Sequence, residues 1–306
     1  MPLIVTGTVG IDTVYTPAEH REKVLGGSCT YFAAAASFYG PVRIVAAVGD
    51  DFPPAFGESL ARFGRIDTAG LEHRKGSKTF AWGGKYFESM NRRETLFTEL
   101  GVLIERPPAV PAAYADSQFV FLANSHPAVQ LGMLEPLTRR RLVVADTMDL
   151  WIKTARAELD LLLTKVDGLV LNYDEAELLT GKANTVTAAR HILRMGPKFV
   201  VVKKGEHGCI LVHKDGIAAL PAYPTEQVVD PTGAGDSFAG GMMGHIAGQM
   251  TGKQDAVAFK TLREALAHGT VVASFTIENF SLDRLAKLTP AELDRRYQEF
   301  VGMVRV

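Results

Sequence analysis

Short apolar segments alternate with helical patterns along most of this 306-residue chain, and this alternation constrains the fold more than any other feature. The segments expected to form buried strands are LIVTGTVGID, VRIVAAVGDD, FVFLAN, RLVVAD, DGLVLN, KFVVVKKG and CILVHKDG. Helical patterns separate most of them, namely GGSCTYFAAAASFYG, DEAELLTG, TAARHILRMG and the segment from Ala234 to Met250. The alternation predicts βαβ units and a mainly parallel sheet. We expect one α/β domain over residues 1–306, because no repeat or linker divides them.

One region breaks this rhythm. Residues 78–98, KTFAWGGKYFESMNRRETLFT, alternate apolar and polar side chains around a central Gly83-Gly84 pair. This pattern is typical of an antiparallel hairpin. A hairpin inserted into a parallel fold predicts a small β-lid over the ends of the strands, formed by segments near 12–24 and 76–102.

The charge balance and the cysteines limit the possible partners and location. The net charge is −1 with both signs well mixed, which argues against nucleic-acid or anionic-membrane partners. The two cysteines, Cys29 and Cys209, lie in apolar surroundings, so a disulfide framework is not expected. With no signal-like start and no apolar run approaching 18 residues, the expected location is cytoplasmic.

Several common site motifs are missing from the sequence. There is no G-x-x-x-x-G-K-[ST] loop, no strict G-x-G-x-x-G fingerprint, no H-E-x-x-H and no G-x-S-x-G. A dehydrogenase is disfavoured because the Gly-rich turn that should precede an acidic ribose-binding residue is missing.

The segment DPTGAGDSFAGG carries the strongest chemical signal. Gly233, Ala234 and Gly235 would expose consecutive N–H groups at a helix N-terminus, an arrangement that binds anions. A transferring phosphoryl group needs such donors because negative charge accumulates on its equatorial oxygens. Asp236 beside them could accept the proton of an attacking hydroxyl. The alternative is a turn followed by a helix of small residues packed closely on the sheet.

This segment, as D-x-T-G-A-G-D-S-F, resembles the C-terminal signature of the ribokinase-like, or phosphofructokinase-B-like, carbohydrate kinase family. The resemblance implies a three-layer α/β fold, with a mainly parallel central sheet, helices on both faces and a small β-lid. It also implies transfer of the ATP γ-phosphate to a sugar or nucleoside hydroxyl. Other landmarks of the family occur in the expected order: GTVGID, GGS, NYDEAELLTG, KKGEHG and AHGTVVASFTIENFS.

On the acceptor side, the resemblance assigns substrate contacts to Asp12, Gly26, Gly27, Ser28, Tyr31 and Asn124. Three polar contacts to ribose are altered, since Gly10, Tyr31 and Asn124 stand where ribokinase would have Asn, Asn and Glu. Because unmatched buried polar groups discriminate strongly, ribose itself is disfavoured. Tyr31, with Phe80, Trp82 and Tyr86, could form an aromatic wall for a pyranose or a nucleobase, or these rings could simply pack on one another.

On the nucleotide side, the resemblance links Asn172 and Glu175 to magnesium and phosphate. It assigns ATP contacts to Asn172, Lys204, Gly205, Gly208 and His268. Each has a structural alternative: Asn172 and Glu175 could cap a helix, Lys203 and Lys204 could be a solvated strand end, and His268 could be a packed helix residue.

Asp230 and Thr232 match positions that help to hold a monovalent cation, such as K⁺, in this family. The loop from Ser274 to Ser281 would supply the remaining oxygens. The alternative is turn chemistry, because Asp before Pro commonly begins a turn.

Together these features predict an ATP-dependent, Mg²⁺-using carbohydrate kinase whose partners are ATP and a small-molecule acceptor. A sugar or sugar-like acceptor is favoured and a nucleoside is the alternative. A second alternative is a catalytically idle sugar-binding or regulatory protein, against which the intact Asp236 argues. The resemblance also suggests a homodimer formed through the lid.

Overall fold

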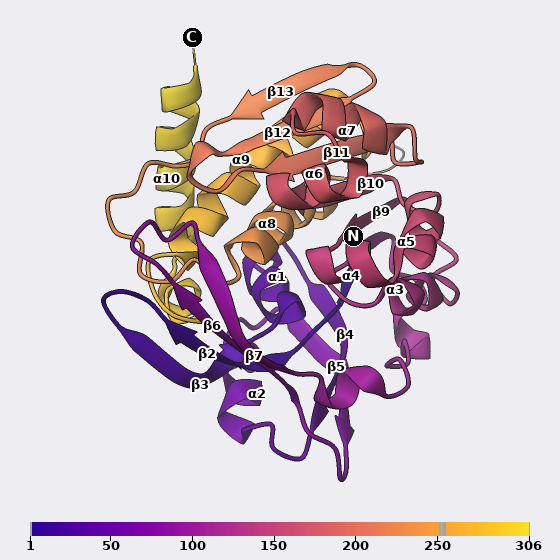
Figure 1. The fold of residues 1–306 in the computed structure, drawn as a ribbon, viewed down its shortest axis with the longest axis vertical. Coiled ribbons are helices and arrows are strands. Elements are labelled where there is room, and N and C mark those ends of the chain that lie inside the picture. The colour runs from indigo at the N-terminus through magenta and orange to yellow at the C-terminus, as the bar shows by residue number, and fades with distance from the viewer. Residues whose placement is uncertain (1, 251, 253–254, 306) are drawn as a thin grey trace.

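The computed structural model describes residues 2–250, 252 and 255–305. Within this part of the chain the main sheet has nine strands in the order β13-β12-β11-β10-β9-β8-β1-β4-β5 (Figure 1). From β5 to β11 neighbouring strands run parallel, and β12 and β13 add an antiparallel edge. The bounds are β1 Leu3–Thr6, β4 Val42–Gly49, β5 Ile66–Arg74, β8 Phe119–Leu122, β9 Leu142–Asp146, β10 Gly168–Asn172, β11 Phe199–Lys203, β12 Cys209–His213 and β13 Gly216–Leu220.

Helices cover both faces of this sheet (Figure 1). One face carries α1 Ser28–Ala36, α2 Pro54–Ala61, α8 Ala234–Gln249, α9 Phe259–Thr276 and α10 Pro290–Val304. The other face carries α3 Pro127–Leu134, α4 Asp149–Thr154, α5 Arg156–Leu163, α6 Tyr173–Thr180 and α7 Thr185–Leu193. Four 3₁₀ turns complete the described elements: η1 Gly101–Ile104, η2 Ala112–Tyr114, η3 Gly205–His207 and η4 Leu285–Lys287.

The apolar strands explain this three-layer arrangement. Alternate side chains of a strand point to opposite faces, so a strand buried on both sides must be apolar throughout. Leu3 and Val5 of β1 pack in the core beneath α1, α8 and α9, whereas Ile4 packs in the core beneath α3, α5 and α7. The predicted fold class is therefore confirmed.

A second sheet of four strands lies beside the main one, in the order β3-β2-β6-β7 (Figure 1). Its bounds are β2 Gly10–Tyr15, β3 His20–Gly26, β6 Phe80–Tyr86 and β7 Arg93–Glu99. We call it the lid sheet. Strands β2 and β6 pair in parallel, while β3 and β7 pair antiparallel to them at the edges.

The Gly83-Gly84 pair does not form the turn of the β6–β7 hairpin. It lies within β6, where the register against β7 shifts, and the turn falls in residues 87–92. A Cβ atom on Gly83 would lie 2.2 Å from the Phe97 ring, and one on Gly84 would lie 2.1 Å from the Trp82 ring. The two glycines therefore make room for aromatic rings on the lid.

None of the helices in the described part of the chain combines the length and the apolar character needed to cross a membrane.

Helix α8 lies between α1 and α9, and its glycines permit the close approach. A Cβ on Gly240 would lie 2.3 Å from the carbonyl oxygen of Phe32 in α1. A Cβ on Gly241 would lie 3.0 Å from the carbonyl oxygen of His268 in α9. Since both neighbours are backbone atoms that cannot rotate away, these contacts fix the position of α8.

We predict that Gly240→Ala lowers the free energy of unfolding by about 1–3 kcal/mol, because the added methyl forces α1 and α8 apart. Gly302→Ala in α10 is the matched control. A Cβ there meets no atom within 4 Å, so the change should raise stability by about 0.5–1 kcal/mol. Urea unfolding of both variants measures the difference, and equal effects would contradict the packing argument.

Candidate active site

Polar side chains gather where four neighbouring parallel strands end. Asp146 ends β9, Asn172 ends β10, Lys203 ends β11, and Asn124 follows β8 by two residues. These strands are adjacent in the sheet, so the residues share one edge. Ligands of open α/β sheets bind at this carboxyl edge.

The N-terminus of α8 meets the same edge. Gly233, its N-cap, has a left-handed backbone with φ of +75°, and a Cβ there would lie 2.2 Å from the ring of Tyr31. A Cβ on Gly235 would lie 2.8 Å from Lys203 Nζ, so the ammonium sits directly against the first turn. Gly233 is therefore required as glycine, whereas the neighbour of Gly235 is the end of a flexible side chain.

The N–H groups of a first helical turn have no acceptor within the helix. Here the N–H of Ala234 bonds to the carbonyl of Pro231 at 3.2 Å, and that of Ser237 to Gly233 at 2.8 Å. The donors between them, at Gly235 and Asp236, supply the remaining positive end of the helix. A phosphate oxygen bound here would meet these donors and the Lys203 ammonium together.

Asp236 lies in this first turn and is half-buried. Desolvation and the negative charge of Asp146 raise its pKa to about 7, against the opposing effects of Lys203 and Arg93. A carboxyl group with such a pKa can accept a proton near neutral pH.

A buried charge cluster surrounds Lys203. Its Nζ lies 3.8 Å from Asp146 Oδ2. Burial opposes the charge of Lys203, but the carboxylates of Asp146, Glu175 and Asp236 outweigh it and raise the pKa of the ammonium. Burial raises the pKa of Asp146, and burial together with the Asp146 charge raises that of Glu175 to about 8.

Asn172 and Glu175 form a capping box at the start of α6. Asn172 Oδ1 accepts from the Glu175 N–H, and Glu175 Oε2 accepts from the Asn172 N–H, each at 2.8 Å. Asn172 and Glu175 therefore do cap the helix, as the structural alternative predicted. The cap uses the Oε2 atom of Glu175.

Asp12 and the diglycine lie together across the site. The Asp12 side chain is 4% exposed and accepts a hydrogen bond from the backbone of Gly27. A Cβ on Gly26 would lie 1.9 Å from Asp12 Oδ2, so only glycine leaves room for this carboxyl group. Desolvation and the charges of Asp230 and Asp236 raise the pKa of Asp12 to about 8.

Two predicted acceptor contacts are engaged inside the protein. Ser28 Oγ accepts from the Thr8 N–H at 3.1 Å, which ties the loop after β1 to α1. Tyr31 is 1% exposed, and its ring packs under Gly233 rather than standing in an open aromatic wall. Its hydroxyl has no hydrogen-bond partner among the described residues.

Asn124 is held by its neighbours. Its Oδ1 accepts from Trp151 Nε1 at 2.9 Å, and its Nδ2 lies 3.1 Å from the sulfur of Met148. The Trp151 ring in turn packs edge-on against His126, at 5.1 Å between ring centroids. The amide is thus fixed at the sheet edge, with an indole beside it.

The KKGEHG segment turns beside the site. Gly205 has φ of +57° and Gly208 φ of +84°, and a Cβ on Gly208 would lie 2.0 Å from the Leu220 carbonyl oxygen. Lys203 shares the α8-facing side of β11 with Val201. Lys204 follows the end of β11 and is the N-cap of the turn η3.

His268 lies in a stack of aromatic side chains. Its ring stacks against His245 at 3.8 Å and Tyr297 at 4.0 Å, and its Nδ1 lies 3.2 Å from the Tyr39 hydroxyl. Burial and His245 lower the pKa of His268 to about 3. The packed-helix alternative describes this environment, and the nucleotide contact stays a prediction.

Asp230 lies 1% exposed beneath the loop that follows α9. Its Oδ1 accepts from the Thr232 N–H at 2.8 Å, while its Oδ2 has no hydrogen-bond partner among the described residues. Burial raises the pKa of Asp230 to about 6. The N–H groups of Val229 and Asp230 both bond to the carbonyl of Ile277 in that loop.

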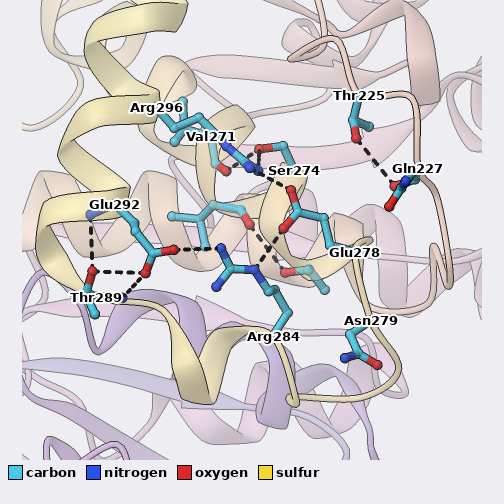
Figure 2. A network of polar contacts seen from close by, with 12 residues as sticks. Thr225, Gln227, Val271, Ser274, Glu278, Asn279, Arg284, Thr289, Glu292 and Arg296 are labelled. Atoms are coloured by element: carbon cyan, nitrogen blue, oxygen red, sulfur yellow. Dashed lines mark hydrogen bonds and ion pairs between the residues drawn. The ribbon is translucent and has the colours of Figure 1, made fainter.

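A polar network fastens this loop (Figure 2). Glu278 accepts from Arg284 at 2.8 Å and pairs with Arg296 at 2.6 Å. Arg284 also bonds to Glu292 at 3.1 Å, and Glu292 forms a capping box with Thr289 at the start of α10. The loop beside Asp230 is thereby tied to α10.

The lid sheet reaches the site through β6, β7 and the turn between them. Tyr86 is 6% exposed, and its hydroxyl lies 3.2 Å from Thr232 Oγ1. Asn91 Nδ2 donates to Glu206 Oε1 at 2.7 Å, which joins the tip of the hairpin to the turn after β11. The positive charge of Arg93 lowers the pKa values of Asp12 and Asp236.

The sequence did not predict a role at the site for Asp146, Arg93 or Lys203. Lys203 was considered only as a residue of a solvated strand end. A usable signal existed for two of them, because Asp146 and Lys203 each close an apolar strand at the sheet edge where ligands bind. Nothing in the sequence marks Arg93, since its place depends on how the lid folds back.

Comparison with known proteins agrees with this geometry. The model of the pfkB family of carbohydrate kinases matches residues 11–286. A cytidine kinase from Thermococcus kodakarensis is 32% identical over 252 residues, which cover 79% of this chain and 87% of that protein. Among solved structures, Methanocaldococcus jannaschii nucleoside kinase superposes with a TM-score of 0.76 at 18% identity, covering 97% of this chain and 98% of the other. Thermotoga maritima ribokinase gives 0.74 at 20% identity, covering 97% and 99%.

The fold and the matched sequence define an ATP-dependent kinase that phosphorylates an alcohol group. The chain belongs to the pfkB family of carbohydrate kinases.

We predict that activity falls as the pH drops through about 7, because Asp236 accepts a proton only when ionised. Asp146→Asn removes a neighbouring negative charge, so it should lower the pKa of Asp236 and move the inflection to lower pH. The pH profile of kcat/KM for ATP measures this. Asp160→Asn, at an exposed ion pair with Arg156, is the control and should leave the inflection in place. An unmoved or raised inflection in the Asp146 variant would contradict the argument.

Proposed function

We propose that the chain transfers the γ-phosphate of ATP to a hydroxyl group of a sugar or sugar-like acceptor, with Asp236 as the general base. One observation carries the proposal. Asp236 stands in the first turn of α8, beside a helix N-terminus and the Lys203 ammonium, and its pKa is about 7. A proton acceptor and an anion site thus occupy one place, as phosphoryl transfer requires.

Each residue of the site has a proposed role in phosphoryl transfer. Asp236 takes the proton of the acceptor hydroxyl as its oxygen attacks the phosphorus. The backbone of Gly233, Ala234, Gly235 and Asp236 stabilises negative charge on the transferring group. Asp12, Gly26, Gly27, Ser28 and Asn124 shape and hold the acceptor side, and Tyr31 supports Gly233 from beneath.

The nucleotide is proposed to lie against the turn of Lys204, Gly205 and Gly208. Glycine at the last two positions permits the left-handed backbone that shapes this turn. His268 is left out of the binding surface because its ring is sandwiched between His245 and Tyr297.

The donor set beside the nucleotide fits Mg²⁺. The Glu175 carboxylate and the Asn172 side chain would supply hard oxygen ligands, directly or through water, and Mg²⁺ keeps several waters in most sites. When bound, the ion neutralises charge on the phosphate oxygens. The residues themselves hold Glu175 in place through its capping box with Asn172.

A monovalent cation, such as K⁺, is proposed beside Asp230 and Thr232. The support is the buried Asp230 Oδ2, which lacks a hydrogen-bond partner among the described residues. A buried carboxylate oxygen without a partner is costly, and a cation would offset that cost.

The lid is proposed to close over the acceptor and exclude water, so that ATP is not lost to hydrolysis. The contacts of Tyr86 with Thr232 and of Asn91 with Glu206 support this role. The exposed edge strand β7 supports a homodimer through the lid, since unpaired strand edges readily pair with another chain. A cytoplasmic location is proposed from the two buried free thiols, Cys29 and Cys209.

A nucleoside is the second candidate acceptor. The cytidine kinase resembles this chain over 87% of its own length, further than a shared signature alone would extend. The indole of Trp151 beside Asn124 is a surface on which a base could stack.

We predict that Asp236→Asn lowers kcat by about 10²- to 10⁴-fold, because the amide cannot accept the hydroxyl proton. ADP release from ATP and Mg²⁺ is measured across a panel of sugars and nucleosides, for the wild type and the variant. Asp160→Asn serves as the control for surface charge. The panel also separates the two acceptor classes.

Two outcomes would count against the proposal. If no acceptor stimulates turnover while sugars still bind, the protein is an idle sugar-binding protein. If an acceptor is phosphorylated equally well by the variant, the base lies elsewhere.

A further inference from the structure

Lys203 places a largely buried ammonium group at the candidate site. It is the last residue of β11, its side chain is 18% exposed, and its Nζ lies against the first turn of α8. The closest ion-pair partner among the described residues is Asp146, whose Oδ2 is 3.8 Å away. That distance is too long for a hydrogen bond.

The hydrogen-bonding capacity of Lys203 is therefore unused. An ammonium group carries three N–H donors, and none of the described residues places an acceptor within hydrogen-bonding distance of Nζ. A largely buried charge is normally paired and hydrogen-bonded. The missing acceptors must come from a ligand or from water.

The surroundings identify the chemistry of that ligand. Nζ lies against the first turn of α8, whose N–H donors include those of Gly235 and Asp236, so a ligand that reaches both is an anion with several oxygens. Asp236 stands in the same turn, so the anion lies within reach of the proposed base. The group that satisfies both conditions is the phosphoryl group in transfer.

We propose that Lys203 is a further catalytic residue, whose ammonium donates to a non-bridging oxygen of the γ-phosphoryl group of ATP, and that Asp146 positions it. This inference rests on the proposed function. In the step, the acceptor oxygen forms a bond to phosphorus, the bond from phosphorus to the ADP oxygen breaks, and the hydroxyl proton passes to Asp236. Lys203 keeps its protons and offsets charge on the transferring oxygens.

A purely structural role is the rival explanation, in which Lys203 only neutralises Asp146, Glu175 and Asp236. The two roles predict different effects on the affinities for ADP and ATP. A structural lysine affects ADP and ATP alike, whereas a lysine that contacts the γ-phosphoryl group discriminates between them.

The test is calorimetric binding of ADP and of the non-hydrolysable analogue AMP-PNP, with MgCl₂ at pH 8.5. In Lys203→Met we expect the preference for AMP-PNP over ADP to fall by about 10- to 100-fold, because a charge-assisted hydrogen bond is lost. Lys203→Arg should keep most of the preference. Lys214→Met, in the exposed turn between β12 and β13, is the matched control for a lost charge and should change neither affinity.

A second pair of variants separates folding from function. Lys203→Met leaves Asp146 unpaired and can fail to fold, so Asp146→Asn with Lys203→Met removes both charges together. We expect the double variant to show the same lost preference as Lys203→Met, because Asp146 acts through Lys203. With any acceptor that the wild type phosphorylates, kcat should fall while the KM for that acceptor stays unchanged.

The outcomes are distinguishable. If the wild type binds neither nucleotide, the proposed function is wrong and this inference with it. If the wild type prefers AMP-PNP and both the single and double variants keep that preference, the kinase proposal stands and the role of Lys203 is overturned.

Discussion

The approach of the first turn of α8 to the carboxyl edge of the sheet is the contact on which the rest of the site depends. Gly233 permits it, because it has a left-handed backbone and a side chain there would collide with the ring of Tyr31. The helix brings its N–H donors and Asp236 to strands whose last residues are polar. Gly240 fixes the same helix against α1 at its middle, so the core packing and the chemical site share one rigid element.

Charge is concentrated where the two sheets meet. Desolvation raises the pKa values of Asp12, Asp236 and Glu175 toward or above neutrality, while Lys203 and Arg93 oppose part of that effect on Asp236. Lys203 comes from the main sheet and Arg93 from the lid sheet. The lid sheet therefore contributes to the electrostatics around Asp236, and a displacement of Arg93 would alter them.

Sequence reasoning succeeded where one local segment carries the whole signal, and it failed where two distant segments must meet. The segment DPTGAGD predicts a helix N-terminus with a carboxylate beside it. This prediction was possible because all the residues of that arrangement are contiguous in the sequence. The Gly83-Gly84 pair looks like a turn, yet its purpose is to accommodate the rings of Trp82 and Phe97, one of which comes from the partner strand. Strand β5 and the edge strand β13 were not expected either, since their mixed burial hides the apolar pattern.

The sequence by itself determined the alternation of strands and helices, the three-layer α/β class, the family and the segment that holds Asp236, because periodicity and contiguous motifs are local properties. Only the tertiary structure decided that Asp146 and Lys203 stand together at the sheet edge and that His268 lies in an aromatic stack. The physical reason is that adjacency in a parallel sheet, and the face a side chain occupies, depend on strand order and packing. Two neighbouring lysines, indistinguishable in the sequence, differ in this way: Lys203 ends β11 against the first turn of α8, and Lys204 begins the turn that follows.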